Sequence, residues 1–387
     1  MRLRIAVVAL VFGLGAACRK DVASSPGRVA VAVDLQARAV AADEARLERI
    51  ELRSSQLSAF AGHDVTMHAV VWTPPGFDPD AGHPALYYVH GFGGTPAKAA
   101  ARVTPGLEAV PTPTAPRFVV VFLDGSHALG HHVFADSASM GPWGTALTEE
   151  LIPAIDRRYG TPKDARGHFL AGHSSGGWSS LWVMISHPEQ FGGVWSTAPD
   201  PVDFRDFVGV DIYTFENAYR SPVGRTVYLE YRDGEPIRSL QDYVEDERAR
   251  RPVGGQFYSF DAVFSPRRDG EPRPLFDRES GAVDRSVAEA WRSWDISWLL
   301  RTQWAQRAGG LQGKLHVIVG TEDTYGLQRP AQLLADELSR VGSDAEFVFV
   351  PGRDHGDLYD PHPDYYPDGL WAKIEREVGA ASRSGRK

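Results

Sequence analysis

The stretch GHFLAGHSSGGWSSL, residues 167–181, decides the fold of this chain. Its first six residues predict a short buried strand, and residues 174–188 have the pattern of a helix. The turn between them must be tight, so Gly172 and Gly176 leave room where a Cβ would collide. Ser174 is then placed at the N-terminus of the helix, where free amides and the helix dipole favour developing negative charge. This turn makes Ser174 a candidate nucleophile.

Apolar runs on both sides of this stretch predict the rest of a sheet. Several are short, continuously apolar and followed by glycine-rich loops, as in strands that are buried on both faces of a parallel sheet. The expected strands are 47–58, 64–73, 85–90, 117–125, 167–172, 192–199, 314–320 and 345–352. Expected helices are 145–160, with Thr145 as a possible N-cap, 174–188 and 330–342. Alternating strands and helices predict a three-layer α/β fold with a mostly parallel, twisted sheet.

Residues 200–310 interrupt this alternation and are too long for a simple crossover. We expect an insertion above the C-terminal edge of the sheet, where ligands bind in open α/β folds. Near its end, Trp291, Trp294 and Trp298 have helical spacing, which predicts one helix packed on the sheet. The whole folded domain is expected to span residues 45–380.

A serine hydroxyl needs a neighbouring base to become a good nucleophile. In a strand-turn-helix serine site the chain order is nucleophile, acid, base, which leaves four histidines after Ser174. His355 follows the last expected strand, in VFVPGRDHGDL, and is our choice. The others are His187 at a helix end, His316 within a strand and His362 in a loop.

The imidazole needs an acid that orients it and stabilises its charged form. Asp323, in VIVGTEDTYG, follows the preceding expected strand and lies at the same sheet edge. Its rivals are the adjacent Glu322 and two residues that follow strand 192–199, Asp200 and Asp203.

Attack on a carbonyl creates an oxyanion that needs preorganised N–H donors. One donor should be the amide of Ser175, directly after the nucleophile. The second should come from the loop HGFGGT after strand 85–90, with Phe92 as the first choice and Gly93 as the second.

No cofactor or metal is expected. His131 and His132, with Asp136, are possible ligands, but adjacent histidines point in different directions, so we interpret them as loop residues near the pocket. HGFGG lacks the Lys-Ser/Thr of a phosphate-binding loop. The net charge of −9 makes nucleic acid an unlikely partner class.

The N-terminus predicts export. Arg2 and Arg4 precede an apolar run at 5–14 and small residues before Cys18, which is the order of a secretory signal over residues 1–17. The run is too short to span a membrane. LGAAC also resembles a bacterial lipoprotein signal, with lipidation of Cys18 as a membrane tether; simple cleavage after Ala17 is the alternative. Residues 18–44 are expected to be a flexible tether, and the protein periplasmic or anchored to the outer membrane.

Five motifs together resemble the Putative esterase family, which includes esterase D, S-formylglutathione hydrolases, feruloyl esterases, enterochelin esterases and antigen 85 mycolyltransferases. They are YYVHGFGGT, FLDG…FADSASMG…ELIPAID, GHSSGGWSSL, GTEDTYG and PGRDHGD, and the resemblance covers residues 45–200 and 312–360. It implies an α/β-hydrolase fold and a triad of Ser174, Asp323 and His355. Residues 200–310 depart from the compact members, so no substrate follows from the resemblance.

The sequence therefore predicts a serine esterase that cleaves carboxylic esters through an acyl-enzyme. Its substrate would be a small-molecule, carbohydrate or lipid ester. An acyltransferase with the same triad, a peptidase and an inactive binding protein on a hydrolase scaffold are the alternatives.

Overall fold

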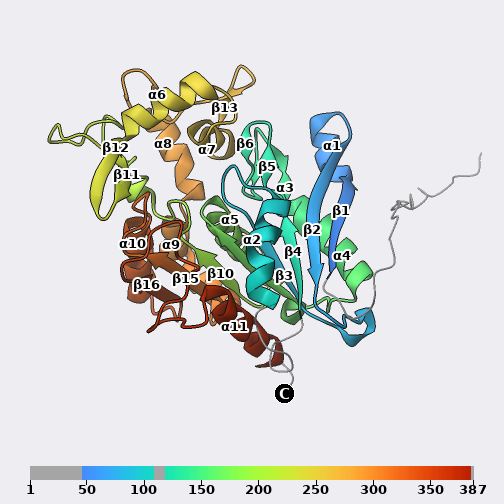
Figure 1. Cartoon of the computed structure of the whole chain (residues 1–387). Helices are drawn as coiled ribbons and strands as arrows, with labels where there is room; N and C mark the ends of the chain where they lie inside the picture. Colours follow the sequence, from blue (N-terminus) through green and yellow to red (C-terminus); the bar gives the residue numbers. More distant parts are fainter. Residues whose placement is uncertain (1–45, 109–117, 385–387) are drawn as a thin grey trace, which may run out of the picture. The chain divides into compact units, whose positions relative to one another are not determined.

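An eight-stranded sheet runs through the part of the chain that the computed structural model describes, residues 46–108 and 118–384 (Figure 1). The spatial order is β1-β2-β4-β3-β9-β10-β15-β16, and β2 is antiparallel to β1 and β4 while the other neighbours are parallel. The predicted α/β fold with a mostly parallel sheet is confirmed. The strands are β1 Arg46–Ser54, β2 Val65–Thr73, β3 Ala85–Val89, β4 Val119–Leu123, β9 His168–His173, β10 Val194–Thr197, β15 Leu315–Gly320 and β16 Glu346–Val350.

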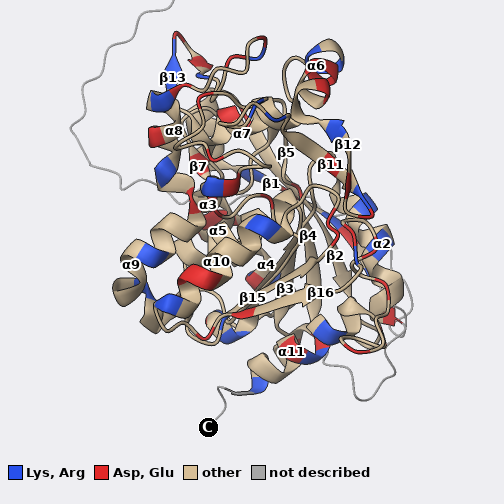
Figure 2. Ribbon diagram, turned by 90° about the vertical axis from the view of Figure 1, so that its left-hand side faces the viewer, with Lys and Arg blue, Asp and Glu red and all other residues tan. Residues whose placement is uncertain are grey.

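Helices cover both faces of the sheet (Figure 2). On one face α2 packs against α11, and on the other α5 packs against β9, β10 and α9, with α10 beside α9. Every residue of β3 and β4 is buried, as the continuous apolar runs predict for strands between two helical layers. The main layer helices are α2 Pro96–Glu108, α4 Ile152–Tyr159, α5 Ser175–Ser186, α9 Ile296–Leu311, α10 Gln328–Arg340 and α11 Leu370–Ser384.

The segment between β10 and β15, up to the start of α9, forms a group of helices and hairpins beside the sheet (Figure 1). Its own core is aromatic: Trp291 is buried against Phe204, Phe207 and Phe264. We call residues 200–295 of this segment the insertion. Its main elements are β11 Tyr228–Arg232, β12 Glu235–Ser239, α6 Leu240–Arg250, α7 Gln256–Phe264, β13 Arg267–Arg268, β14 Glu271–Pro272 and α8 Arg285–Trp291.

Three local predictions are wrong. The expected strand 47–58 ends at Ser54, because the Ser54 hydroxyl accepts the Leu57 amide at 3.1 Å and starts helix α1, Ser55–Ala61. Thr145 caps nothing: its helix begins two residues earlier with α3, Trp143–Ala146, and continues through a π-helical turn into α4. The Thr145 amide instead donates to Asp136 at 3.0 Å.

The third concerns the three tryptophans, which do not share a helix. Helix α8 ends at Trp291, a 3₁₀ turn follows, and the Asp295 carboxylate accepts the Trp298 amide as the N-cap of α9. Trp294 nevertheless contacts Trp182 of α5, so one of the three packs on a sheet helix as expected.

The N-terminal predictions, namely the signal 1–17, lipidation of Cys18 and the tether 18–44, lie outside the described residues. No helix within the described ranges is both long and apolar enough to span a membrane.

Candidate active site

Ser174 occupies a strained turn between β9 and α5. Its φ of 60° and ψ of −126° are unusual for a residue with a side chain, and its amide donates to the Thr197 carbonyl at 3.0 Å. A Cβ on Gly172 would lie 2.1 Å from the Gly176 carbonyl oxygen, and one on Gly176 would lie 2.0 Å from that of Val89. The strand, tight turn and helix predicted from residues 167–188 are thus present, and both glycines are sterically required.

Asp323 and His355 form a hydrogen-bonded pair. They follow the neighbouring strands β15 and β16, and the His355 Nδ1 lies 2.8 Å from the Asp323 Oδ2. The Asp323 side chain is buried, and its other oxygen accepts the Tyr325 amide at 2.9 Å. Because a carboxylate only accepts, Nδ1 carries the proton and Nε2 is left as the basic nitrogen of the ring.

Among the described residues none of the rival acids forms a hydrogen bond with His355. Asp200 accepts a hydrogen bond from the Ser175 hydroxyl, and Asp203 forms an ion pair with Arg205. Glu322 is exposed at the surface. Of the sequence candidates, Asp323 is the carboxylate that meets His355.

The rival histidines also lie elsewhere. His316 is in β15 and stacks on Trp195, with ring centroids 4.6 Å apart. His187 is the C-cap of α5, and His362 packs against Tyr365 and Tyr366.

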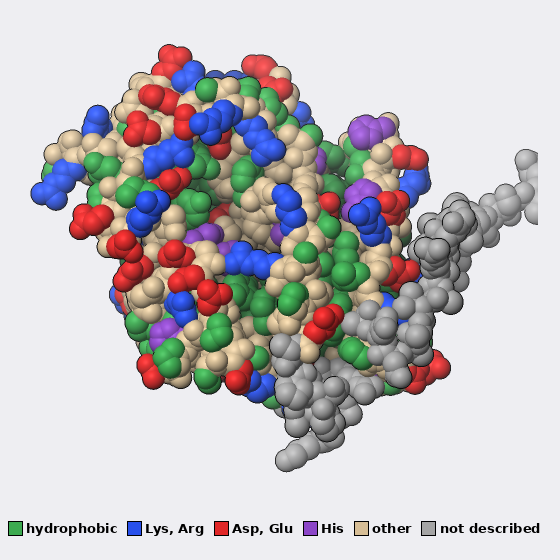
Figure 3. Space-filling model, viewed as in Figure 1, with side chains coloured by type: hydrophobic (Ala, Val, Ile, Leu, Met, Phe, Trp, Pro, Cys, Tyr) green, Lys and Arg blue, Asp and Glu red, His purple; other side chains and the backbone are tan. Residues whose placement is uncertain are grey.

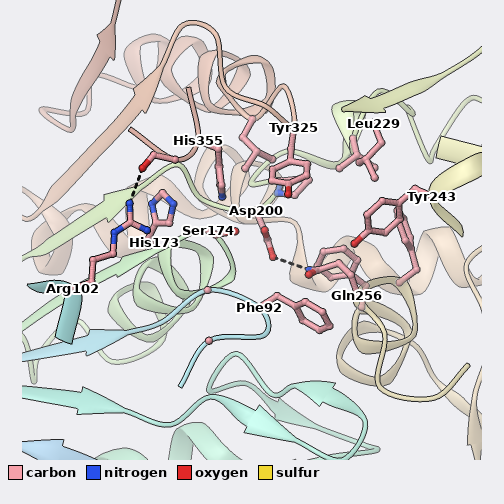
Figure 4. Close-up of a pocket in the computed structure, with 18 residues that line it drawn as sticks. Phe92, Arg102, His173, Ser174, Asp200, Leu229, Tyr243, Gln256, Tyr325 and His355 are labelled. Carbon is pink, nitrogen blue, oxygen red and sulfur yellow. Dashed lines mark hydrogen bonds between the residues drawn. The ribbon is translucent and has the colours of Figure 1, made fainter. Parts of the chain in front are cut away.

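Ser174 and His355 line one pocket with a volume of about 350 Å³ (Figure 4). Within the described residues the His355 ring is hydrogen-bonded to Asp323, and no hydrogen bond joins it to the Ser174 hydroxyl. Catalytic hydrogen bonds are often long without substrate and tighten only in the Michaelis complex. A histidine-lined hollow opens beneath the insertion in the space-filling view (Figure 3).

The insertion supplies one side of this pocket. Phe257 and Phe260 come from α7, Tyr243 from α6 and Leu229 from β11. The opposite side is more polar, with His173 and Arg102 beside His355 (Figure 4). The residues that line this pocket are Gly91, Phe92, Gly94, Arg102, His173, Ser174, Asp200, Pro201, Val208, Leu229, Tyr243, Gln256, Phe257, Phe260, Tyr325, Leu327, His355 and Gly356.

The HGFGGT loop lies directly against the nucleophile. A Cβ on Gly91 would be 3.0 Å from the Ser174 Cβ and 3.6 Å from its Oγ. Phe92 follows in the pocket lining, while Gly93 is exposed with φ of 71°. Ser175 is the first residue of α5, where backbone amides have no intrahelical acceptor. The two predicted oxyanion donors thus belong to the loop after β3, which borders Ser174, and to the first turn of α5.

His90 fixes the start of this loop. Its Nδ1 lies 2.8 Å from the Gly91 carbonyl oxygen and donates to it, and its Nε2 accepts the Gly125 amide at 3.1 Å. The Nε2 atom also lies 3.4 Å from the Asp124 Oδ1, so the loop that follows β3 is joined to the loop that follows β4.

His131 and His132 stabilise the same loops. The Nε2 of His131 lies 3.1 Å from the His90 carbonyl oxygen, and that of His132 lies 3.1 Å from the carbonyl oxygen of Asp124. Their Nδ1 atoms accept the amides of Val133 and Phe134. Burial lowers the pKa of His131 to about 3. Both rings are thus neutral and use both nitrogens in loop hydrogen bonds, as the interpretation of loop residues expects.

Sequence reasoning missed several residues at the site. His173, the residue before the nucleophile, lies 4.5 Å from the His355 ring, and burial lowers its pKa well below the ordinary value. Arg102 of α2 donates to the Gly356 carbonyl at 2.6 Å and so supports the loop of His355. No motif marks Arg102 or Gln256, because each comes from a segment without a recognisable pattern; His173 could be suspected from its place in the turn.

Comparison with known proteins agrees with this geometry. Residues 62–355 match the family described as Putative esterase, which is most of the chain. The chain belongs to this esterase family. The family is named for ester hydrolysis, and we therefore class the protein as a carboxylic ester hydrolase with a serine site. No curated protein is significantly similar to the esterase in sequence.

Solved structures share the fold of this esterase. A ferulic acid esterase is 14% identical with a TM-score of 0.56, covering 88% of this chain and 99% of that one. FphF, the fluorophosphonate-binding serine hydrolase F of Staphylococcus aureus, is 14% identical with a TM-score of 0.50, covering 87% and 98%. At this identity the likeness concerns the fold alone.

Proposed function

We propose that this esterase cleaves carboxylic esters through a Ser174–His355–Asp323 triad and an acyl-enzyme. The observation that carries the proposal is the 2.8 Å pair of Asp323 and His355 in the pocket that holds Ser174 at its strained turn.

In the first step, His355 Nε2 takes the proton of the Ser174 hydroxyl as the oxygen attacks the ester carbonyl. Asp323 stabilises the imidazolium that forms. The amides of Phe92 and Ser175 donate to the oxyanion, which needs fixed donors in a site shielded from water.

Collapse of this tetrahedral intermediate breaks the bond to the alcohol oxygen, and His355 gives the proton to the departing alcohol. Water, activated by the same imidazole, then attacks the acyl-serine and releases the acid. The imidazole then returns the proton taken from water to the Ser174 oxygen, which restores the free enzyme.

The substrate is proposed to be a small-molecule, carbohydrate or lipid ester. The pocket beside Ser174 is lined by aromatic and aliphatic side chains of the insertion, which favours an apolar group on one side of the ester. The ferulic acid esterase that shares this fold is consistent with such a group.

The test is hydrolysis of p-nitrophenyl acetate by Ser174→Ala. We expect kcat to fall on the order of 10³-fold or more, and equal rates would refute the proposal. Ser186→Ala is the matched control, because Ser186 is an exposed serine at the end of the same helix. Added alcohols that divert the acyl group into new esters faster than water does would identify an acyltransferase.

We also propose export, with lipidation of Cys18 as a membrane tether. The support is the order of charged, apolar and small residues before the single cysteine. Fractionation of a Cys18→Ser variant tests the tether: the esterase should move to the soluble periplasmic fraction, whereas unchanged membrane fractionation would contradict lipidation.

A further inference from the structure

Asp200 is a buried carboxyl beside the nucleophile that the triad does not use. It lies three residues after β10 and is 8% exposed, and its amide donates to the Ser174 carbonyl at 3.2 Å. Ala198, two residues before Asp200, has φ of 38°, a left-handed conformation that is strained for a residue with a Cβ. The Ala198 amide donates to Ile318 of β15, so the strained turn is fixed to the neighbouring strand.

The carboxylate of Asp200 holds the side chain that follows the nucleophile. The Ser175 hydroxyl donates to the Asp200 Oδ2 at 2.5 Å, and Ser175 is 1% exposed. This hydroxyl is therefore engaged within the protein, and the part of Ser175 that faces the reaction is its backbone amide, the proposed oxyanion donor.

Asp200 also contacts the insertion through Gln256, the first residue of α7 (Figure 4). The Gln256 Nε2 lies 3.4 Å from both the Asp200 Oδ2 and the Ser175 Oγ. The Glu247 carboxylate of α6 accepts the amides of Gln256 and Phe257, the latter at 3.0 Å, and so holds the start of α7. The same helix supplies Phe257 and Phe260 to the pocket.

We propose that Asp200 is a positioning residue of this site, which fixes Ser175 and, through Gln256, the first turn of α7 against the turn that carries Ser174. This inference rests on the proposed function. The insertion would then help to set the catalytic geometry. The Asp200 carboxylate connects Ser175, the proposed oxyanion donor, to helix α7, which lines the proposed substrate pocket.

The contacts of Asp200 favour its charged form, because the groups on Oδ2 are donors. Burial opposes this and raises its pKa to about 6. The titratable groups that face it are His355 after β16, and Asp323 and Tyr325 after β15. Lowering the pH through 6 therefore protonates Asp200 and weakens its hold on Ser175 and Gln256.

The experiment measures kcat and KM for p-nitrophenyl acetate and butyrate from pH 4.5 to 8. In the wild type we expect kcat/KM to fall as the pH is lowered through about 6, because Asp200 takes up a proton there. Asp200→Asn should lose kcat on the order of 10- to 100-fold, because misplaced groups slow chemistry more than binding, and it should lack the fall in kcat/KM near pH 6.

Ser175→Ala keeps the backbone amide but removes a hydrogen bond that lowers the pKa of Asp200. The fall in kcat/KM that Asp200 causes should therefore move to higher pH, a change that simple loss of folded protein would not produce. The matched control is Asp295→Asn: Asp295 is also buried with a pKa raised to about 6, but it caps α9 away from the pocket. Asp295→Asn should lower Tm without changing the fall in kcat/KM near pH 6.

An Asp200→Asn variant with wild-type kcat and an unchanged pH profile would overturn the inference. Ser174→Ala, measured in parallel, separates the two claims. If Ser174→Ala is inactive and Asp200→Asn behaves as wild type, only the role of Asp200 fails. If Ser174→Ala keeps full activity, the proposed function itself fails.

Discussion

The Asp323 carboxylate and the His355 imidazole are 32 positions apart in the sequence, yet Oδ2 and Nδ1 lie 2.8 Å apart. They meet because β15 and β16 are parallel neighbours, so the loops that follow them leave the sheet at the same edge. β9 ends at that edge as well and supplies Ser174. Parallel strand order therefore accounts for the assembly of the proposed triad.

Asp323→Asn should lower kcat on the order of 10³- to 10⁴-fold near neutral pH with little change in KM. The amide keeps the shape but favours the wrong imidazole tautomer and removes the charge that stabilises the imidazolium. Steady-state kinetics with p-nitrophenyl acetate measure the loss. Glu322→Gln, one position away at the surface, is the control and should retain wild-type kcat; a comparable loss in both variants would speak against Asp323.

Gly91→Ala should fold but react more slowly. The new Cβ would lie 3.0 Å from the Ser174 Cβ, closer than almost all natural contacts, so Ser174 or the oxyanion loop must shift by a few tenths of an ångström. Shifts of this kind in a reacting group cost up to about 10²-fold in rate. Gly309→Ala adds the same methyl to α9 with nothing within 4 Å and should leave kcat unchanged. Full activity of Gly91→Ala would show that the loop does not border the reacting serine.

Tyr243→Ala should change the chain-length preference of the enzyme. Tyr243 lines the pocket from α6, and removing its ring enlarges the wall that the insertion provides. The ratio of kcat/KM for p-nitrophenyl octanoate to that for the acetate should rise. Tyr258→Ala, on α7 with its hydroxyl bonded to Glu271 and outside the pocket, should leave the ratio as it is. The same octanoate-to-acetate ratio in both variants would mean that the acyl chain does not contact the Tyr243 side of the pocket.

Glu375 makes stability depend on pH. It is buried in α11, its Oε2 has no hydrogen-bond partner among the described residues, and burial raises its pKa from 4.5 to about 7. As the pH rises, Glu375 therefore loses its proton at a lower pH in the unfolded chain than in the folded one. The free energy of unfolding should fall as the pH rises from about 4.5 to 7.

Glu375→Gln should remove this part of the pH dependence and, at pH 8, stabilise the protein by up to about 3 kcal/mol. Urea unfolding of both proteins at pH 5 and pH 8 measures it. The two stabilities should be similar at pH 5 and diverge at pH 8. A difference that does not grow with pH would mean that the carboxyl is solvated in solution.

Much of the fold follows from local pattern. β3 and β4 are continuous apolar runs and are completely buried, and residues 167–188 carry the strand, the glycines and the helix that place the nucleophile. Helix α2 could not be found in this way, since Pro105 and Gly106 break its helical pattern and its stability depends on packing against α11. The helical spacing of Trp294 and Trp298 was misleading, because Asp295 lies between them and is the N-cap of a new helix, α9.

From the sequence, the site could be predicted only for residues that directly follow a strand of the sheet. Asp323 and His355 follow their strands directly, so strand order brings them together. Asp200 also follows a strand, but its partners do not follow from strand order. They are the Ser175 hydroxyl and the side-chain amide of Gln256, which is 56 positions away in the sequence. Residues of the insertion have no repeating pattern, so their approach to the nucleophile is visible only in three dimensions.

The most direct test of the account is the site of fluorophosphonate labelling, read by mass spectrometry of peptides from the intact, folded enzyme. We expect one adduct, on the peptide that carries Ser174, and labelling at least 10³-fold slower in His355→Ala because the serine then lacks its base. An adduct on a different serine, or labelling of His355→Ala at the wild-type rate, would contradict the proposed nucleophile and base.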